Sequence, residues 1–119
     1  MAIMALFRSP HIDKTVYDSI IEELGLEAQP AAGALTHACA FDDNGGVCVC
    51  DVWETRQDFE AFLSNRLRPA FARLNLEFEQ PTILDAYAFN VTNDVDKYKP
   101  ALAAAAAGRA SPGGEARPV

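Results

Sequence analysis

Apolar residues recur at helical spacing over residues 13–24, and this stretch predicts the first helix of the chain. Its apolar stripe consists of Tyr17, Ile20, Ile21 and Leu24. Asp13 can accept hydrogen bonds from the free amides of the first turn, and Ile12 can pack on Tyr17. Gly25 then supplies a stop signal, because glycine readily adopts the left-handed conformation in which many helices end.

Four other segments predict β-strands, because they are short, apolar and bounded by turn-forming residues. They are residues 2–7, 34–41, 47–53 and 82–91. We expect the first strand to be buried on both faces. The Asp-Asp-Asn-Gly-Gly sequence at residues 42–46 predicts a hairpin turn between the second and third strands, since Asn-Gly supplies the positive φ angles that such turns need.

A second helix is expected to begin at Thr55, which forms a weak capping box with Asp58 three residues later. Its apolar stripe consists of Phe59, Phe62, Leu63 and Leu67. Pro69 should break or kink this helix, because proline lacks the amide proton of the helical ladder, and residues 69–74 could add another turn or two. Residues 95–119 are rich in Ala, Gly and Pro, so we expect a mostly disordered tail after a single folded domain at residues 1–94.

The predicted order of elements is strand–helix–strand–strand–helix–strand. Right-handed crossovers place the first and third strands at the centre of an antiparallel sheet with both helices on one face, which is the α+β, ferredoxin-like βαββαβ arrangement. The strands are apolar on both faces, although the helices can cover only one. We therefore expect a homodimer in which the open sheet faces of two copies pack together.

Composition indicates a soluble globular chain, since half of its 119 residues are hydrophobic and 23% are charged. The net charge of −7 argues against nucleic acid and anionic membranes as partners, because both require a basic surface. The apolar runs are too short to span a bilayer. The N-terminal run lacks a basic segment before it, so it indicates a first strand rather than a signal peptide, and we expect a cytoplasmic location.

Cysteine and histidine spacing predicts no metal site. Cys48 and Cys50 point the same way along one strand, too far apart for an easy disulfide, and no Cys-x-x-Cys pair with further ligands is present. We interpret these residues and Cys39 as buried free thiols that serve as small apolar side chains. The glycine pair at residues 45–46 belongs to a hairpin and not to a phosphate-binding loop.

A family resemblance is carried by residues 49–62, which read Val-x-Asp-Val-Trp-Glu-Thr-x-x-x-Phe-x-x-Phe. Gly-x-Leu-Thr-His at residues 33–37 and Phe-Asn-Val at residues 89–91 add to it. Together with the order of elements, residues 2–92 resemble the dimeric α/β-barrel superfamily and, within it, the antibiotic-biosynthesis-monooxygenase-like proteins.

This resemblance implies that two copies pair into a dimeric α/β barrel, with a ligand cavity between the helices and the sheet of each subunit. The superfamily includes cofactor-independent oxygenases of aromatic polyketides, polyketide cyclases and heme-degrading enzymes. The heme-degrading members carry a Trp at the position of Phe62 and a His near the position of Ala72, both of which this chain lacks. The resemblance therefore implies no heme and no other cofactor.

His37 is the leading candidate for chemistry, because a neutral imidazole among apolar neighbours can act as acid or base toward a phenol or enol. The alternative is a histidine satisfied by the backbone or by a dimer partner. Asp51 interrupts an apolar strand, and a buried carboxylate needs hydrogen-bond donors or a raised pKa. It could instead be structural and orient Trp53. We take His37 and Asp51 as the catalytic pair.

Five further side chains are candidates for substrate binding: Tyr17, Trp53, Phe62, Tyr87 and Asn90. Trp53 could form the floor of an aromatic cavity, although large aromatic residues of strands more often belong to the core. Tyr17 and Tyr87 could donate a phenolic proton to a substrate, and Asn90 could orient a carbonyl group.

Our first functional hypothesis is a cofactor-independent monooxygenase that acts on a small hydrophobic metabolite of aromatic or polyketide-like character. His37 would deprotonate a phenol or enol, and the carbanion would react with oxygen directly. A polyketide cyclase-like enzyme is the neighbouring possibility. A non-catalytic dimeric protein that binds a small ligand, or serves as an auxiliary subunit, is the alternative from another class.

Overall fold

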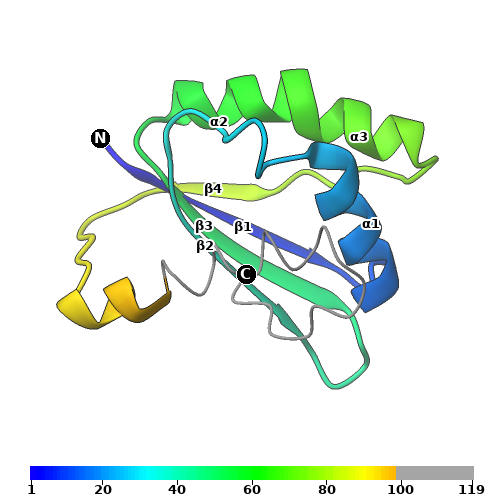
Figure 1. The fold of residues 1–119 in the computed structure, drawn as a ribbon, viewed down its shortest axis with the longest axis horizontal. Coiled ribbons are helices and arrows are strands. Elements are labelled where there is room, and N and C mark those ends of the chain that lie inside the picture. Colours follow the sequence, from blue (N-terminus) through cyan, green and yellow to red (C-terminus); the bar gives the residue numbers. More distant parts are fainter. Residues whose placement is uncertain (99–119) are drawn as a thin grey trace. The chain divides into compact units, whose positions relative to one another are not determined.

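The computed structural model describes residues 1–98. The first compact unit, Met1–Tyr87, contains one antiparallel sheet with the strand order β2-β3-β1-β4 (Figure 1). Its strands are β1 (Ile3–Ser9), β2 (Ala34–Phe41), β3 (Val47–Trp53) and β4 (Thr82–Asp85). The central position of β1 and β3 is confirmed, as is the ferredoxin-like βαββαβ order of an α+β domain.

The first helix, α1, spans Lys14–Leu24 and is bounded by the predicted caps. The Asp13 side chain accepts a hydrogen bond from the Val16 amide at 2.9 Å, which satisfies one of the free donors of the first turn. At the other end Gly25 has a φ of 61°, and its amide donates to the Ile21 carbonyl. These two caps fix where Tyr17 lies along the helix.

The second helical segment does not break at Pro69 but continues beyond it, as one of the two predicted alternatives allowed. It consists of α2 (Arg56–Phe62), a π-helical turn (Leu63–Leu67) and α3 (Arg68–Arg73). Thr55 caps α2 as predicted, by accepting a hydrogen bond from the Asp58 amide at 3.0 Å. A proline ring clashes with the carbonyl four residues earlier in a regular helix. The wider π-helical turn before Pro69 accommodates the ring, and so the helix continues.

Both helical segments pack on one face of the sheet, where the buried core lies. One cluster joins Tyr17 and Ile20 of α1 and Phe71 of α3 to Val47, and the other joins Phe59 of α2 to Ile3 and Trp53. Along β1 the burial alternates, with Ile3, Ala5 and Ser9 buried and the residues between them more exposed. In the single chain β1 is therefore buried on the face that the helices cover, while Met4 and Leu6 on the other face are partly buried. Burial of β1 on both faces requires a second copy of the chain and stays a prediction.

The fourth strand is also shorter than predicted, since β4 ends at Asp85 and not at residue 91. The neighbouring strand, β1, explains why β4 is shorter than predicted. Ile3, the first residue of β1, pairs with Asp85, so β1 offers no further strand residues to pair with. A single additional hydrogen bond from the Ala86 amide to the Ala2 carbonyl ends the ladder. The apolar residues that follow have the strand pattern but lack a neighbouring strand.

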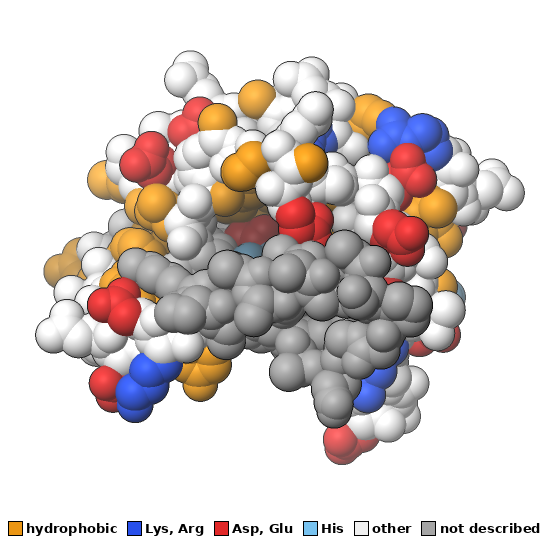
Figure 2. Space-filling view, viewed as in Figure 1, with side chains coloured by type: hydrophobic (Ala, Val, Ile, Leu, Met, Phe, Trp, Pro, Cys, Tyr) orange, Lys and Arg blue, Asp and Glu red, His pale blue; other side chains and the backbone are white. Residues whose placement is uncertain are grey.

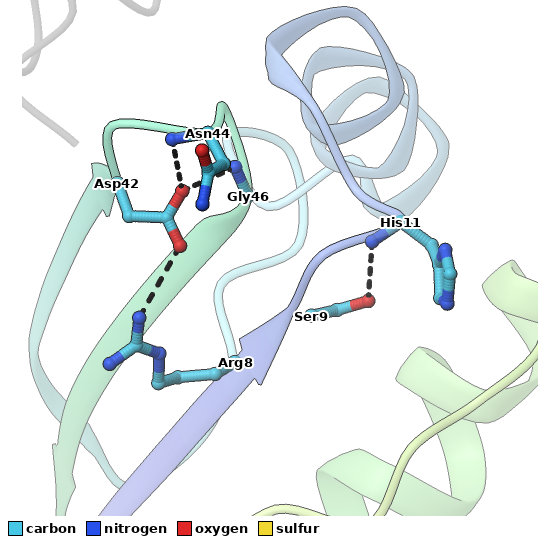
Figure 3. A network of polar contacts seen from close by, with 6 residues as sticks. All are labelled: Arg8, Ser9, His11, Asp42, Asn44 and Gly46. Atoms are coloured by element: carbon cyan, nitrogen blue, oxygen red, sulfur yellow. Dashed lines mark hydrogen bonds and ion pairs between the residues drawn. The ribbon is translucent and has the colours of Figure 1, made fainter.

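The predicted hairpin turn between β2 and β3 is present and is held by one side chain (Figure 3). Asp42 Oδ1 accepts hydrogen bonds from the amides of Asn44 and Gly46, both at 2.9 Å. Asp42 Oδ2 accepts from Arg8 at 3.3 Å. Gly45 has the positive φ, at 84°. The turn sets the register of β2 against β3, and this register decides which side chains meet across the two strands.

Two further features of the structure concern the distribution of surface charge and the length of the helices. On the face shown in Figure 2, acidic side chains lie dispersed among hydrophobic and polar ones. Within residues 1–98, none of the helices has the length and apolar character needed to cross a membrane.

The second compact unit begins at Ala88, and a 3-10 helical turn over Asn93–Lys97 is its regular element among the described residues. The disordered tail predicted for residues 95–119 falls outside the described residues from position 99 onward.

Candidate functional site

The centre of the candidate site is a histidine–aspartate pair on two neighbouring strands. His37 of β2 and Asp51 of β3 are direct partners in the antiparallel register, so their side chains project from the same face of the sheet. His37 Nδ1 lies 2.6 Å from Asp51 Oδ1. The two residues that we took from the sequence as the catalytic pair are thus in hydrogen-bond contact.

Tyr17 completes a hydrogen-bonded chain from the helix layer. Its phenolic oxygen lies 2.8 Å from His37 Nε2, and the two rings are stacked with an interplanar angle of 15°. Tyr17 occupies the beginning of α1, where its amide donates to the Asp13 carbonyl at 2.8 Å. The N-terminal cap of α1 therefore determines where the phenol meets the sheet.

Hydrogen-bond chemistry fixes the direction of this chain. An ionised carboxylate can only accept, so Asp51 selects the tautomer of a neutral imidazole in which Nδ1 carries the proton. His37 Nε2 is then the acceptor and the Tyr17 hydroxyl is the donor. The site thereby places a base, Nε2, directly beside an acid, the phenol.

Tyr17 is held in its protonated form. Burial raises the pKa of the phenol above its ordinary value of 10.0, and the adjacent Cys39 thiol and Asp51 carboxylate raise it further. Burial also raises the pKa of the Cys39 thiol above 9.0. The Cys39 thiol lies close enough to affect the pKa of Tyr17, so the buried hydroxyl has two polar neighbours, Cys39 and His37. A charged tyrosinate is disfavoured here except as a transient species.

Trp53 lies beside Asp51, at the end of the pair opposite to Tyr17. Its indole Nε1 lies 3.5 Å from Asp51 Oδ2, and its ring packs against Phe59 and Phe62 with centroid distances of 5.4 and 5.1 Å. The side chain is 2% exposed. Trp53 is thus a core residue whose indole also orients the Asp51 carboxylate.

The polar pair lies between two apolar clusters and still reaches solvent. Val49 precedes Asp51 on the same face of β3 and packs against the cluster of α1, whereas Trp53 belongs to the cluster of α2. The side chain of His37 is 31% exposed and that of Asp51 is 15% exposed. The imidazole is therefore the part of the pair that is more accessible to a ligand.

Four of the seven predicted site residues form the hydrogen-bonded chain, and a fifth packs on it: Tyr17, His37, Asp51 and Trp53, with Phe62 against the indole. Tyr87 is fully exposed beyond the end of β4 and is not brought to this chain. Asn90 belongs to the second unit and is exposed.

Cys39 is the residue whose role the sequence did not reveal. Its position two residues after His37 predicts the same strand face. Its contact with Tyr17, however, depends on how α1 docks on the sheet, which no local pattern encodes. All three cysteines are free thiols, as predicted, but each is only partly buried. Among residues 1–98, no group of three or more His, Cys, Asp or Glu side chains is arranged to hold a metal ion.

Comparison with known proteins yields structural matches only. No protein-family model matches the sequence, and no curated protein matches it either. Among solved structures, the chain is similar to SnoaB, a cofactor-independent oxygenase from Streptomyces nogalater, with a TM-score of 0.54 and 13% identity over 76% of this chain and 98% of that one.

Two further solved structures give comparable matches. A candidate antibiotic-biosynthesis monooxygenase from Deinococcus radiodurans has a TM-score of 0.53 and 16% identity, covering 78% of this chain and 100% of that one. NE2512 from Nitrosomonas europaea, a protein of unknown function, has a TM-score of 0.52 and 17% identity, covering 76% and 92%. At these identities the likeness concerns the fold. The resemblance read from residues 49–62 is confirmed at that level: this chain has the fold of the antibiotic-biosynthesis-monooxygenase-like proteins.

Proposed function

We propose that the protein is a cofactor-independent monooxygenase of a small hydrophobic metabolite with an acidic phenol, enol or benzylic C–H group. The observation that carries this proposal is the chain in which His37 contacts both Asp51 and Tyr17, at 2.6 and 2.8 Å. The fold shared with a cofactor-independent oxygenase agrees with it.

In this proposal His37 Nε2 is the base. A ligand that enters beside the exposed edge of the imidazole displaces the Tyr17 hydroxyl from Nε2, and the phenol then donates to an oxygen of the ligand. Asp51 keeps the proton on Nδ1 and stabilises the imidazolium that forms when Nε2 accepts the ligand's proton. The apolar surroundings favour a neutral aromatic ligand over a charged one.

The resulting carbanion supplies the electrons for oxygen. The carbanion donates two electrons to dioxygen overall and forms a C–O bond, which gives a peroxide. Loss of water then breaks the O–O bond and leaves a carbonyl group. A CH₂ group and O₂ thereby become C=O and H₂O, so the balance requires no external reductant. The protein residues supply only the proton transfers and the orientation of the ligand.

Anthrone tests this function, since its CH₂ group is acidic and its oxidation to anthraquinone consumes one O₂. We expect wild-type protein to accelerate oxygen uptake, with anthraquinone formed in equal amount. His37→Gln should lower the rate by about 100-fold, which is typical for the loss of a general base. His11→Gln is the matched control, because His11 is exposed. Its contact with Ser9 is made by the backbone amide, which the substitution retains (Figure 3).

Equal oxygen uptake by wild-type protein and His37→Gln would overturn the proposal. The melting temperature of each variant shows whether it is folded. Mass spectrometry in ¹⁸O₂ separates oxygenation from simple electron loss, because an oxygenase product carries one labelled oxygen atom.

A further inference from the structure

We propose that the Tyr17–His37 pair also catalyses keto–enol isomerisation of an apolar ketone in the absence of oxygen. This reaction needs an acid that donates a proton to the carbonyl oxygen and a base that removes a proton from the α-carbon. The observation behind the inference is that such an acid and such a base, Tyr17 and His37, are in direct contact. The reaction goes beyond the proposed oxygenation, because it uses no O₂ and leaves the oxidation state of the ligand unchanged. It rests on the site of the proposed function, with His37 as the base, Tyr17 as the donor and Asp51 as the partner of the imidazolium.

The spacing of the two groups matches the spacing of the atoms on which they would act. Tyr17 Oη and His37 Nε2 are 2.8 Å apart. In a ketone the carbonyl oxygen and the α-carbon are separated by two bonds, a distance of about 2.4 Å. A ketone placed at the pair can therefore direct its oxygen at the phenol and its α C–H bond at Nε2 together.

The protons balance within the pair. His37 Nε2 takes the proton from the α-carbon, the C–H electron pair becomes the C=C bond, and the carbonyl oxygen takes the phenolic proton of Tyr17. The ligand leaves as the neutral enol. The imidazolium then returns its proton to the tyrosinate across the same 2.8 Å contact, and the site is restored. No oxidant, reductant or external proton carrier takes part.

The surroundings of the pair favour this cycle. Asp51 lies 2.6 Å from His37 Nδ1, so it stabilises the imidazolium formed halfway through. Burial raises the pKa of Tyr17, which makes the tyrosinate a strong proton acceptor and drives the return step. In the resting state the phenol is neutral, which suits its buried position in an apolar cluster.

Hydrogen exchange into 2-tetralone tests the inference. This neutral aromatic ketone is incubated with the full chain in deuterium oxide under argon, and NMR follows the loss of its α-protons. We expect wild-type protein to accelerate exchange over buffer containing the same concentration of free imidazole. Tyr17→Phe keeps the ring but removes the acid, and His37→Gln removes the base. Each should lower the exchange rate by about 100-fold, while His11→Gln leaves it unchanged.

A wild-type exchange rate no higher than that of Tyr17→Phe, with both proteins folded by circular dichroism, would overturn the inference. Asp51→Asn provides a second test should a Tyr17 variant fail to fold, because it retains the side-chain shape and should also slow exchange. The oxygenation is tested separately with anthrone. Exchange into 2-tetralone without oxygen uptake on anthrone supports isomerisation and rejects the proposed function. Oxygen uptake on anthrone without exchange into 2-tetralone supports the proposed function and rejects isomerisation.

Discussion

His37 and Asp51 face each other across β2 and β3, with Nδ1 2.6 Å from Oδ1, although they lie on a sheet face that is otherwise mainly apolar. A cross-strand polar pair in such a position must satisfy its own hydrogen bonds, since apolar neighbours cannot. Tyr17 and Trp53 supply the remaining contacts. The pair is therefore both a structural element and the chemical centre of the candidate site, and each role can be measured.

Replacement of Asp51 tests the structural role. Asp51→Ala leaves the Nδ1–H group of His37 and the indole N–H group of Trp53 without their acceptor. We expect a loss of about 1–3 kcal/mol in the free energy of unfolding, the usual cost of unpaired buried donors. Urea denaturation gives the value. Asp43→Ala at the exposed hairpin tip is the control and should change stability by less than about 0.5 kcal/mol. Equal effects of the two substitutions would contradict the role of Asp51.

Alkaline pH should destabilise the protein through Tyr17 and Cys39. Both groups have a raised pKa in the folded chain, from ordinary values of 10.0 and 9.0. As pH rises past those ordinary values, the unfolded chain loses these protons while the folded chain keeps them. The unfolded state is therefore favoured and stability falls above about pH 9.

The tyrosine part of this effect can be isolated. Melting temperatures of Tyr17→Phe should decline less than those of wild-type protein between about pH 10 and about pH 11, because the buried phenol is gone. Tyr87→Phe is the control, since Tyr87 is fully exposed. Parallel melting curves for wild-type protein and Tyr17→Phe over this range would rule out the buried phenol as the cause.

Gly33 should tolerate substitution less well than Gly25, although both have positive φ angles, of 85° and 61°. A Cβ atom at Gly33 would overlap the Asp58 side chain, including its Cβ, whereas a Cβ atom at Gly25 would meet nothing within 4 Å. We expect Gly25→Ala to cost about 1 kcal/mol from backbone strain alone. Gly33→Ala should cost clearly more, as thermal or urea unfolding will show. A smaller loss for Gly33→Ala than for Gly25→Ala would mean that the Asp58 contact relaxes without cost.

The open sheet face leads us to expect a homodimer, as the sequence did. Leu84 of β4 pairs with Met4 of β1 on that face and is 49% exposed in the single chain. Sedimentation at micromolar concentration should show a dimer, and Leu84→Lys should shift it toward monomer because the interface would bury a charge. Asn44→Lys, which adds the same charge at the hairpin tip, should leave the dimer intact. A wild-type monomer at that concentration would refute the expectation.

Much of the fold was predictable because its signals are local. The Asp13 and Thr55 caps, the Gly25 stop and the Asp42 hairpin turn act within a few residues of themselves, and all are present as expected. The end of β4 was not predictable from its own sequence. Residues 86–91 have the composition of a strand, but a strand requires a partner, and β1 offers none beyond Ile3. The π-helical turn before Pro69 was not predicted either, because a helix can accommodate a proline by a break, a kink or a wider turn.

The sequence by itself determined which side chains could do chemistry, because a histidine and an aspartate are conspicuous in apolar strands. Strand parity left open whether the two side chains share one sheet face, and the observed register, in which His37 pairs with Asp51, decided that they do. Only the tertiary structure decided that Tyr17, 20 residues before His37, donates to its Nε2 and that Cys39 adjoins the phenol. Those contacts arise where α1 docks on the sheet, and docking depends on the summed packing of many distant residues.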